Sequence, residues 1–189
     1  MNPGHMEFCA SEDWRNLVEE TILPAALRDV LLGDDVLEIG PGPGFTTDVL
    51  RTGTAHLTAV EIDEGLASRL ADRLAGGNVE VVLGDAAALE FADHRFSGAA
   101  SFHMLHHIAP AQQQDRVFSE LARVLVPGGF LVAADGVYSE GSALFHEGDT
   151  YNPVDPEDLA TRLGEAGFTD VDVRLHELGW VCTARTRAV

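Results

Sequence analysis

The sequence predicts an α/β fold: a seven-stranded, mostly parallel sheet with one antiparallel edge strand and helices on both faces. Short apolar segments typical of strands alternate with helical segments between residues 36 and 167, which favours parallel strands joined by crossover helices. A turn with three alternating glycines joins the first strand to a helix. The last two strands, at residues 171–177 and 180–187, are only two residues apart, so they must form an antiparallel hairpin.

The first 32 residues precede this alternation. Residues 1–10 show no clear periodicity, and Gly4-His5-Met6 could be left over from cloning, which limits what His5 can mean. A helix is predicted over residues 11–32, because apolar side chains recur at helical spacing and Ser11 is a good N-cap. Pro24 is expected to bend or restart this helix.

The run V-L-E-I-G-P-G-P-G at residues 36–44 is the most informative part of the chain. A short buried strand leads through the glycines into a helix predicted at residues 45–52. Glycines let the backbone bend sharply and approach a ligand closely, and the helix start offers free N–H groups. The turn therefore predicts a cradle for a nucleoside-containing ligand. A dinucleotide is disfavoured, because the G-x-G-x-x-G pattern would need a glycine at Phe45.

Carboxylates follow the next two strands. Glu61 lies at the tip of the strand at residues 56–62, where it can accept hydrogen bonds from a ribose diol. Asp85 follows the strand at residues 79–83 and suits an amino-group donor. Asp63 is expected to cap the helix at residues 64–74. Either acid alone could be an ordinary loop acid, but their placement after successive strands favours a ligand site.

The second half of the chain supplies histidines and a long connection. The strand at residues 96–102 leads into His103-Met104-Leu105-His106-His107, and a helix is predicted at residues 111–125. The turn V-P-G-G then precedes a strand at residues 130–135. Residues 136–154 are too long for a simple connection and predict a substrate lid or wall, or a short helix that packs Leu144 and Phe145 on the core. Gly167 is expected to end a helix at residues 156–166.

These pieces, in this order, resemble class I S-adenosylmethionine-dependent methyltransferases over roughly residues 36–167. The resemblance implies a Rossmann-like fold, S-adenosylmethionine as cofactor and S-adenosylhomocysteine as product. It implies that Glu38 contacts the methionine amino group, although Glu38 could instead be a strand-end charge paired with an arginine. It also places Glu61 on the ribose, Ile62 on adenine, Asp85 on adenine N6 and the Ala86 N–H on adenine N1. The expected cofactor-binding residues are Glu38, Gly40, Pro41, Gly42, Gly44, Glu61, Ile62, Asp85, Ala86 and Phe102.

We expect one domain over residues 1–189. Within it, residues 1–32 cover the site, 33–135 form the cofactor-binding core, 136–154 the substrate loop, and 155–189 a C-terminal helix and hairpin.

Histidines are the natural candidates for a catalytic base, because their reference pKa is about 6.5. His106 and His146 form the preferred pair, ahead of His103 and His107, and each could instead be a hydrogen-bonded structural histidine. His106, His107, His146 and Asp149 are also acceptable ligands for a divalent metal that orients a chelating substrate such as a keto acid or catechol. Their separation along the chain permits such a site but does not suggest it, so we expect no metal.

Composition narrows the partners. The formal net charge is −19, so the surface should repel nucleic acids and anionic membranes. No segment approaches the length of a membrane span and no secretory signal is seen, which favours a cytoplasmic location. We therefore predict methyl transfer to a small molecule. The alternatives are a protein or tRNA acceptor, or cofactor binding with other chemistry or no catalysis. The acceptor atom and the oligomeric state are left open.

Overall fold

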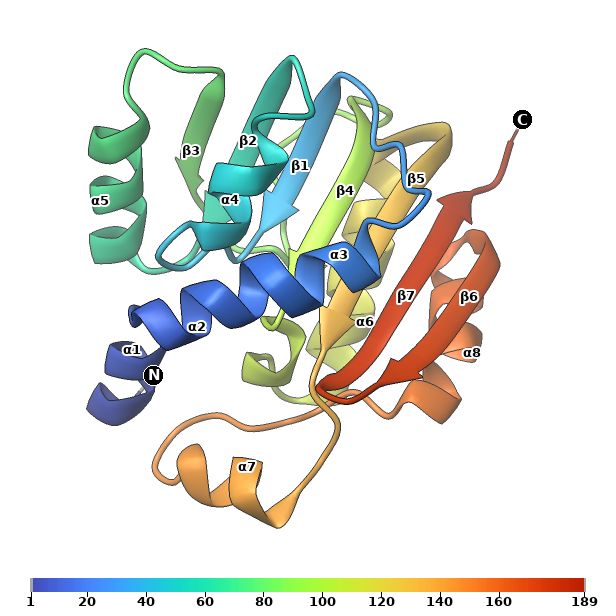
Figure 1. Ribbon diagram of the computed structural model, residues 1–189. Helices are drawn as coiled ribbons and strands as arrows, with labels where there is room; N and C mark the ends of the chain where they lie inside the picture. Colours follow the sequence, from blue (N-terminus) through green and yellow to red (C-terminus); the bar gives the residue numbers. More distant parts are fainter. Residues whose placement is uncertain (1, 189) are drawn as a thin grey trace.

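The computed structural model describes residues 2–188. They form three layers, in which one seven-stranded sheet lies between two layers of helices (Figure 1). The strand order is β3-β2-β1-β4-β5-β7-β6. The strands are β1 (Asp35–Ile39), β2 (His56–Glu61), β3 (Val79–Leu83), β4 (Phe96–Phe102), β5 (Leu125–Asp135), β6 (Phe168–His176) and β7 (Gly179–Thr186). Among these strands only β7 runs opposite in direction to the other six, and it lies one position in from the edge strand β6. The predicted fold class is confirmed.

The two faces of the sheet are covered by different helices. One face packs against α6 (Ala111–Val124) and α8 (Pro156–Ala166), whose buried residues include Phe118, Leu121 and Leu163. The other face packs against the N-terminal helices, α4 (Phe45–Leu50) and α5 (Glu64–Leu74). Alternate residues of each strand point to opposite faces, so Leu37 joins the first core cluster and Val36 joins the second.

The N-terminal segment differs from the prediction in two ways. Residues expected to lack regular structure form α1 (Pro3–Cys9), whose first turn is capped by the side chain of Asn2. The prediction of a single helix over residues 11–32 is wrong. This segment instead comprises α2 (Glu12–Leu17), a π-helical turn η1 (Val18–Ile22) and α3 (Leu23–Ala26). Pro24 cannot donate a backbone hydrogen bond, which accounts for the widened turn just before it. The helix has ended by its C-cap, Leu27, and Asp29, at a φ of 60°, lies in the left-handed conformation just beyond it.

Two segments of the second half also depart from expectation. Strand β5 begins at Leu125 rather than at residue 130, because Leu125 pairs with Phe96 across an irregularity that accommodates the glycine turn. The long connection contains α7 (Glu140–Phe145), but the expected packing of this helix on the core is wrong. Leu144 is 72% exposed, and Phe145 instead contacts Phe8 of α1, with ring centroids 5.5 Å apart.

Local signals were otherwise reliable. Asp63 and Ser11 accept the expected capping hydrogen bonds, and Gly167 ends α8 in the left-handed conformation at a φ of 110°. Within residues 2–188, none of the helices is both long enough and apolar enough to cross a bilayer.

Candidate active site

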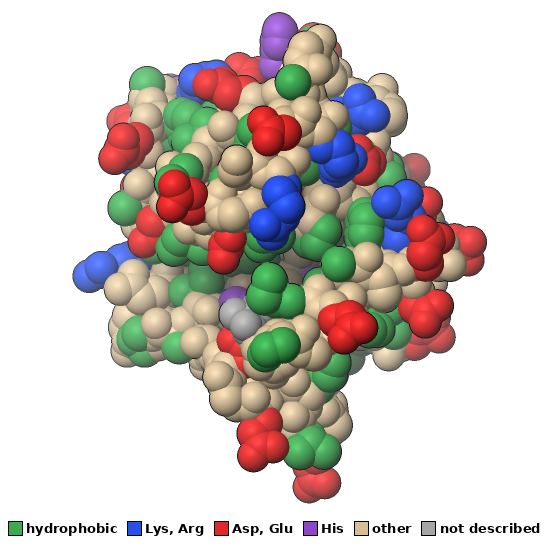
Figure 2. Space-filling model, turned by 90° about the vertical axis from the view of Figure 1, so that its left-hand side faces the viewer, with side chains coloured by type: hydrophobic (Ala, Val, Ile, Leu, Met, Phe, Trp, Pro, Cys, Tyr) green, Lys and Arg blue, Asp and Glu red, His purple; other side chains and the backbone are tan. Residues whose placement is uncertain are grey.

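A cavity of about 380 Å³ opens at the carboxyl ends of β1 to β4. Figure 2 shows a hollow on one face of the molecule, bordered by hydrophobic side chains with a histidine visible at depth. This edge of an open parallel sheet is where α/β folds place their ligands, because loops from neighbouring strands converge there. The cavity volume lies at the small end of the range typical for small-molecule sites.

The glycine turn forms one wall of this cavity through Gly40, Pro41 and Gly42. All three glycines of the turn have a positive φ, between 56° and 91°. A Cβ on Gly42 would meet nothing within 4 Å, so this glycine presents bare backbone to open space. Gly44 does not line the cavity; a Cβ there would clash with Leu70 and Arg73 of α5. Gly42 thus lies where a ligand would approach, whereas Gly44 permits close helix packing.

Glu38 is buried behind the glycine turn rather than exposed in the cavity. It is 1% exposed, and it accepts hydrogen bonds from the hydroxyls of Thr46 and, at 2.6 Å, Thr47. Burial raises the pKa of Glu38 to about 7, although the two threonine hydrogen bonds oppose this rise. The described contacts show Glu38 holding the turn against the start of α4. The expected contact with a methionine amino group stays a prediction.

Glu61 lines the cavity and is fixed from both sides by backbone groups. One carboxylate oxygen accepts from the Gly42 N–H at 3.0 Å, and the other accepts from the Asp63 N–H at 3.0 Å. These bonds orient the carboxylate toward the cavity while each oxygen keeps a further lone pair for a hydroxyl. The next residue, Ile62, is 71% exposed and also lines the cavity. An exposed isoleucine beside an oriented carboxylate suits a ribose with a base stacked on the apolar side chain.

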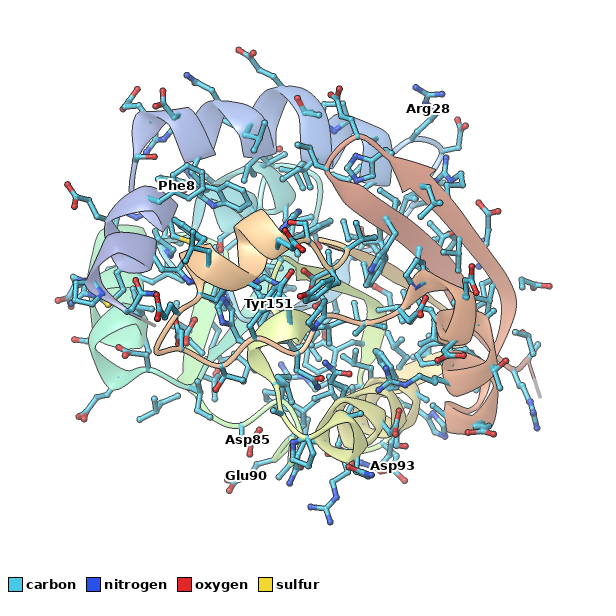
Figure 3. All side chains as sticks on the ribbon, turned by 90° about the horizontal axis from the view of Figure 1, so that it is seen from below. Phe8, Arg28, Asp85, Glu90, Asp93 and Tyr151 are labelled. Carbon is cyan, nitrogen blue, oxygen red and sulfur yellow. The ribbon has the colours of Figure 1, made fainter. Side chains whose placement is uncertain are left out.

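Asp85, Ala86 and Phe102 complete the expected cofactor wall, and all three line the cavity. Asp85 accepts a hydrogen bond from the Ala87 N–H at 2.8 Å, and Figure 3 shows it at the outer rim of the molecule. Its exposure allows one carboxylate oxygen to meet an exocyclic amino group. Phe102, at the end of β4, is buried and closes the floor between Glu61 and the histidine loop.

The N-terminal segment supplies a wall that the sequence analysis described only as a cover. Met6, Cys9, Trp14, Val18 and Ile22 all line the cavity. Helical periodicity indicated that Trp14, Val18 and Ile22 share a face. Within residues 1–10 only Cys9 was considered as a residue that could touch the site, and the residues there showed no periodicity that predicted α1. Burial raises the pKa of the Cys9 thiol to about 11, which leaves it a protonated, apolar part of the wall.

The structure brings the four candidate histidines together but divides them between two positions. His103 and His107 line the cavity, whereas His106 and His146 lie behind it and are each 7% exposed. The ring of His106 lies 4.1 Å from that of His107 and 5.0 Å from that of His146. His5 of α1 joins them, with ring centroids 4.8 Å from His107 and 4.4 Å from His146. The sequence analysis did not count His5 among the candidates, because residues 1–10 show no clear periodicity and Gly4-His5-Met6 could be left over from cloning.

Asp135, at the end of β5, fixes His106. The two oxygens of this fully buried carboxylate accept from the His106 N–H at 3.1 Å and pair with its Nδ1 at 2.5 Å. Burial alone would lower the pKa of His106, but the charge of Asp135 and the hydrogen bond to it raise the pKa above its usual value. The imidazole therefore has one defined orientation. Its Nε2 is buried without a hydrogen-bond partner among the described residues.

Three of the other histidines, His5, His103 and His107, are held as neutral rings. Burial, with smaller contributions from the surrounding histidines, lowers the pKa of His103 to about 4 and that of His107 to about 3. Burial and the neighbouring His146 likewise lower the pKa of His5 to about 4. A histidine with such a pKa is a weak base at neutral pH, although its neutral nitrogen can still accept a hydrogen bond.

The segment after β5 provides the outer wall. His146 follows α7; its Nδ1 lies 2.6 Å from the carbonyl oxygen of Ser142, and its ring stacks on Tyr151, which is labelled in Figure 3, with centroids 4.4 Å apart. Asp149 lines the cavity and lies 3.3 Å from His5 Nδ1. Burial alone would raise the pKa of Asp149, but hydrogen bonds from the Asn2 N–H and from His5 help lower it to about 2. The predicted substrate loop is thus fastened to α1.

Known proteins resemble this chain in sequence and in fold. Curated relatives include the ribosomal RNA small subunit methyltransferase A of Bordetella petrii, 41% identical over 40% of this chain and 30% of the relative. Another is the demethylmenaquinone methyltransferase of Clavibacter sepedonicus, 32% identical over 65% of this chain and 46% of the relative. The chain therefore spans less than half the length of these relatives.

A solved structure, a complex between the Haloferax volcanii Trm112 methyltransferase activator and a methyltransferase, matches the fold with a TM-score of 0.77. It is 18% identical to this chain, with 99% of this chain and 95% of that one covered. At this identity the likeness shows the fold alone.

The methyltransferase-domain family matches residues 37–133, just over half of the chain. The cofactor of this family is S-adenosylmethionine, and the cavity fits it: bare backbone at Gly42 lies beside an oriented Glu61 and the apolar Ile62. The sulfonium group of this cofactor carries a positive charge, which suits a cavity lined by carboxylates and, among the described residues, by no arginine. From the matched residues and the geometry of this cavity, the chain belongs to the methyltransferase-domain family.

Proposed function

We propose that this protein transfers the methyl group of S-adenosylmethionine to a small-molecule acceptor. The observation that carries the proposal is the single cavity that joins the cofactor wall, at Gly42 and Glu61, to the histidine wall, at His103 and His107. Residues of α1, α2 and the loop after β5 close over it. A cavity of about 380 Å³ with these walls suits small molecules, whereas a macromolecule would need a more open surface.

The cofactor supplies an electrophilic methyl group, so the protein has to align the acceptor with it and exclude water. Glu61 would bind the ribose hydroxyls, and Asp85 and Ile62 would hold the adenine. On the other side of the cavity, Trp14 packs edge-on against His103, with ring centroids 5.1 Å apart, and shields this side from solvent. His107 and Asp149 offer polar atoms to an acceptor.

The preferred pair of the sequence analysis, His106 and His146, lies behind the cavity in the described structure. We propose that His103 and His107, which line the cavity, contact the acceptor directly. Their low pKa values favour hydrogen bonding to the acceptor over proton abstraction. An acceptor atom that is already nucleophilic at neutral pH would therefore suit the site best.

A second candidate is methylation of RNA, or of a protein with the help of a partner. It draws support from the ribosomal RNA methyltransferase relatives and from the fold neighbour found with an activator protein. The formal net charge of −19 opposes an RNA acceptor, because RNA affinity depends on cationic side chains that neutralise phosphates. We therefore rank the small-molecule acceptor first.

A two-step experiment separates these candidates. Calorimetry first measures binding of S-adenosylmethionine and S-adenosylhomocysteine. The protein is then incubated with methyl-labelled cofactor and cell extract, and the extract is separated into small molecules, RNA and protein. We expect binding of both compounds and label among the small molecules. Label only in RNA or protein would support the second candidate, and binding without transfer to any fraction would contradict methyl transfer.

A further inference from the structure

Four imidazoles from three separate segments meet at one point behind the cavity wall. His5 comes from α1, His106 and His107 from the 3-10 turn η2 (Leu105–His107), and His146 from the residue after α7. One nitrogen from each of these four side chains lies within 4.8 Å of the other three. The fold thus places four potential metal-binding nitrogens from distant positions at one point.

The second ring nitrogen of three of these histidines already has a partner. Nδ1 of His106 pairs with Asp135 at 2.5 Å, Nδ1 of His146 lies 2.6 Å from the Ser142 carbonyl oxygen, and Nδ1 of His5 lies 3.3 Å from Asp149. Carboxylates and backbone carbonyls on one nitrogen are the partners that orient metal-binding histidines. They fix the ring and leave Nε2 as the donor.

The Nε2 atoms of His106 and His146 have no hydrogen-bond partner among the described residues, although both are buried. An unsatisfied buried polar atom costs about 1–3 kcal/mol, so two of them at one point need an explanation. A cluster of structural histidines would satisfy these atoms by hydrogen bonding. A cation bound between them would satisfy both.

We propose that His5, His106, His107 and His146 bind a divalent transition-metal ion. Imidazole donors suit Zn²⁺, Ni²⁺, Cu²⁺ or Fe²⁺, whereas Mg²⁺ and Ca²⁺ prefer oxygen ligands. Nitrogens around Zn²⁺ lie about 2.0–2.1 Å from the metal, so side-chain rotations would have to draw the four donors closer together. This proposal replaces the expectation, drawn from the sequence, that the site holds no metal. The proposed ligands differ from those considered from the sequence in one residue: His5 takes the place of Asp149, and Asp149 instead orients the His5 ring.

The ion would join the two segments that close the cavity. Asn2 already links α1 to the loop after β5 through the Phe145 carbonyl oxygen at 3.1 Å, and Asp149 accepts from the Asn2 N–H at 2.8 Å. A metal bound by His5 and His146 would hold α1 and this loop together against η2. His107, which also lines the cavity, would place the ion at the wall nearest the acceptor.

Metal stoichiometry provides the direct test. The full chain, prepared without a histidine tag, is stripped with chelator, incubated with Zn²⁺ or Co²⁺, desalted and measured by elemental analysis. We expect one ion per chain and a Co²⁺ absorption spectrum typical of nitrogen ligands. His5→Gln and His146→Gln should each weaken Co²⁺ binding by 10-fold or more. His56→Gln, an exposed histidine at the start of β2, should bind like the wild type and serves as the matched control.

Two further measurements make the result decisive. Binding of S-adenosylhomocysteine, measured by calorimetry on every variant, shows that the fold is intact and tests the proposed function separately. Limited proteolysis within residues 137–153 should slow when Zn²⁺ is added to the wild type, but not when it is added to His5→Gln. If the folded wild type binds no stoichiometric metal, or if His5→Gln and His146→Gln bind it as well as His56→Gln does, the metal site is wrong whatever the outcome for the cofactor.

Discussion

The cofactor wall and the histidine cluster lie on opposite sides of one cavity, but they are built in different ways. The cofactor wall comes from the ends of β1 to β4, between Gly40 and Phe102. Its central carboxylate, Glu61, is held by the backbone and accepts from the N–H groups of Gly42 and Asp63. The histidine cluster collects side chains from His5 to His146. Carboxylates of distant segments orient His5 and His106, and the nearby Ser142 carbonyl orients His146. The positions of the residues in the cofactor wall follow from the ends of neighbouring strands. The positions of the clustered histidines depend on contacts between segments that are distant in the sequence.

This difference predicts how the regions respond to mutation. A residue of the cofactor wall should affect mainly ligand affinity, because the strand ends position the loop independently of the ligand. A residue that supports the histidine cluster should affect mainly stability, because several segments depend on it. Each experiment below tests that contrast.

The largest effect is expected for Asp135→Ala. This fully buried carboxylate accepts from the His106 N–H and the Gly136 N–H and pairs with the His106 ring. Removing one partner of a buried ionic pair costs about 3–5 kcal/mol, so the free energy of unfolding in urea should fall by about that amount. Asp172→Ala, which breaks an exposed ion pair with Arg174, should cost about 0–1 kcal/mol. Similar losses in the two variants would contradict the support that we assign to Asp135.

Glu38→Gln should change how stability depends on pH. The pKa of Glu38 is raised from 4.5 to about 7, so the folded chain holds an extra proton between these values and loses stability as the pH rises through them. The free energy of unfolding of the wild type, relative to Glu38→Gln, should fall by about 3 kcal/mol across this interval.

Urea unfolding at several pH values measures this difference. Glu19→Gln, an exposed residue of η1, serves as the control and should follow the wild type. Parallel curves for the wild type and Glu38→Gln would show that Glu38 stays ionised in the folded chain.

Glu61→Gln tests ligand affinity in the cofactor wall. A neutral amide loses the charge-assisted bonds that we assign to the ribose hydroxyls, so the Kd for S-adenosylhomocysteine should rise by about 10- to 100-fold, measured by calorimetry. The free energy of unfolding should change less than it does for Asp135→Ala, because the amide oxygen of Gln can still accept one backbone hydrogen bond. Glu64→Gln makes the same charge change at an exposed position in α5 and should leave the Kd unchanged. An unchanged Kd for Glu61→Gln would remove Glu61 from the site.

The same contrast explains what the sequence could predict. The cofactor wall follows from local signals, since a glycine turn and carboxylates at strand ends need only the parallel sheet to bring them together. The fold class followed from the alternation of strands and helices, and Asp63 and Gly167 were predicted as caps from their residue types. For the two caps the physical cause lies within a few residues of its effect, and for the sheet it lies in the repeated pattern of short segments along the chain.

The histidine cluster could be predicted only in part, because its cause lies in contacts between distant segments. His106, His107 and His146 were candidates from the composition of two loops, but their convergence depends on α7 lying against η2. His5 was missed because α1 is short, and its position depends on Asn2 and Asp149. The long N-terminal helix failed for a related reason: helical periodicity continued past Pro24, but the chain left the helical path before Asp29.

The smallest effect is expected for the difference between Gly40→Ala and Gly76→Ala, which probes the junction of the two regions. Gly40 has a φ of 65°, and a Cβ there would overlap the side chain of Met104, the residue before η2. Gly76 has a φ of 79°, and a Cβ added there would have no atom within 4 Å. Gly76→Ala should therefore lower the free energy of unfolding only by the backbone strain, about 1–2 kcal/mol. Urea unfolding should show a larger loss for Gly40→Ala, by about 1 kcal/mol for the overlap. In the Met104→Ala background the extra loss should shrink, because that substitution removes the Cγ atom that would lie 2.1 Å from the new Cβ and leaves only the Met104 Cβ, at 2.9 Å. Equal losses for both glycines in the wild-type background would mean that Met104 moves aside freely, and that the two walls are not coupled through this contact.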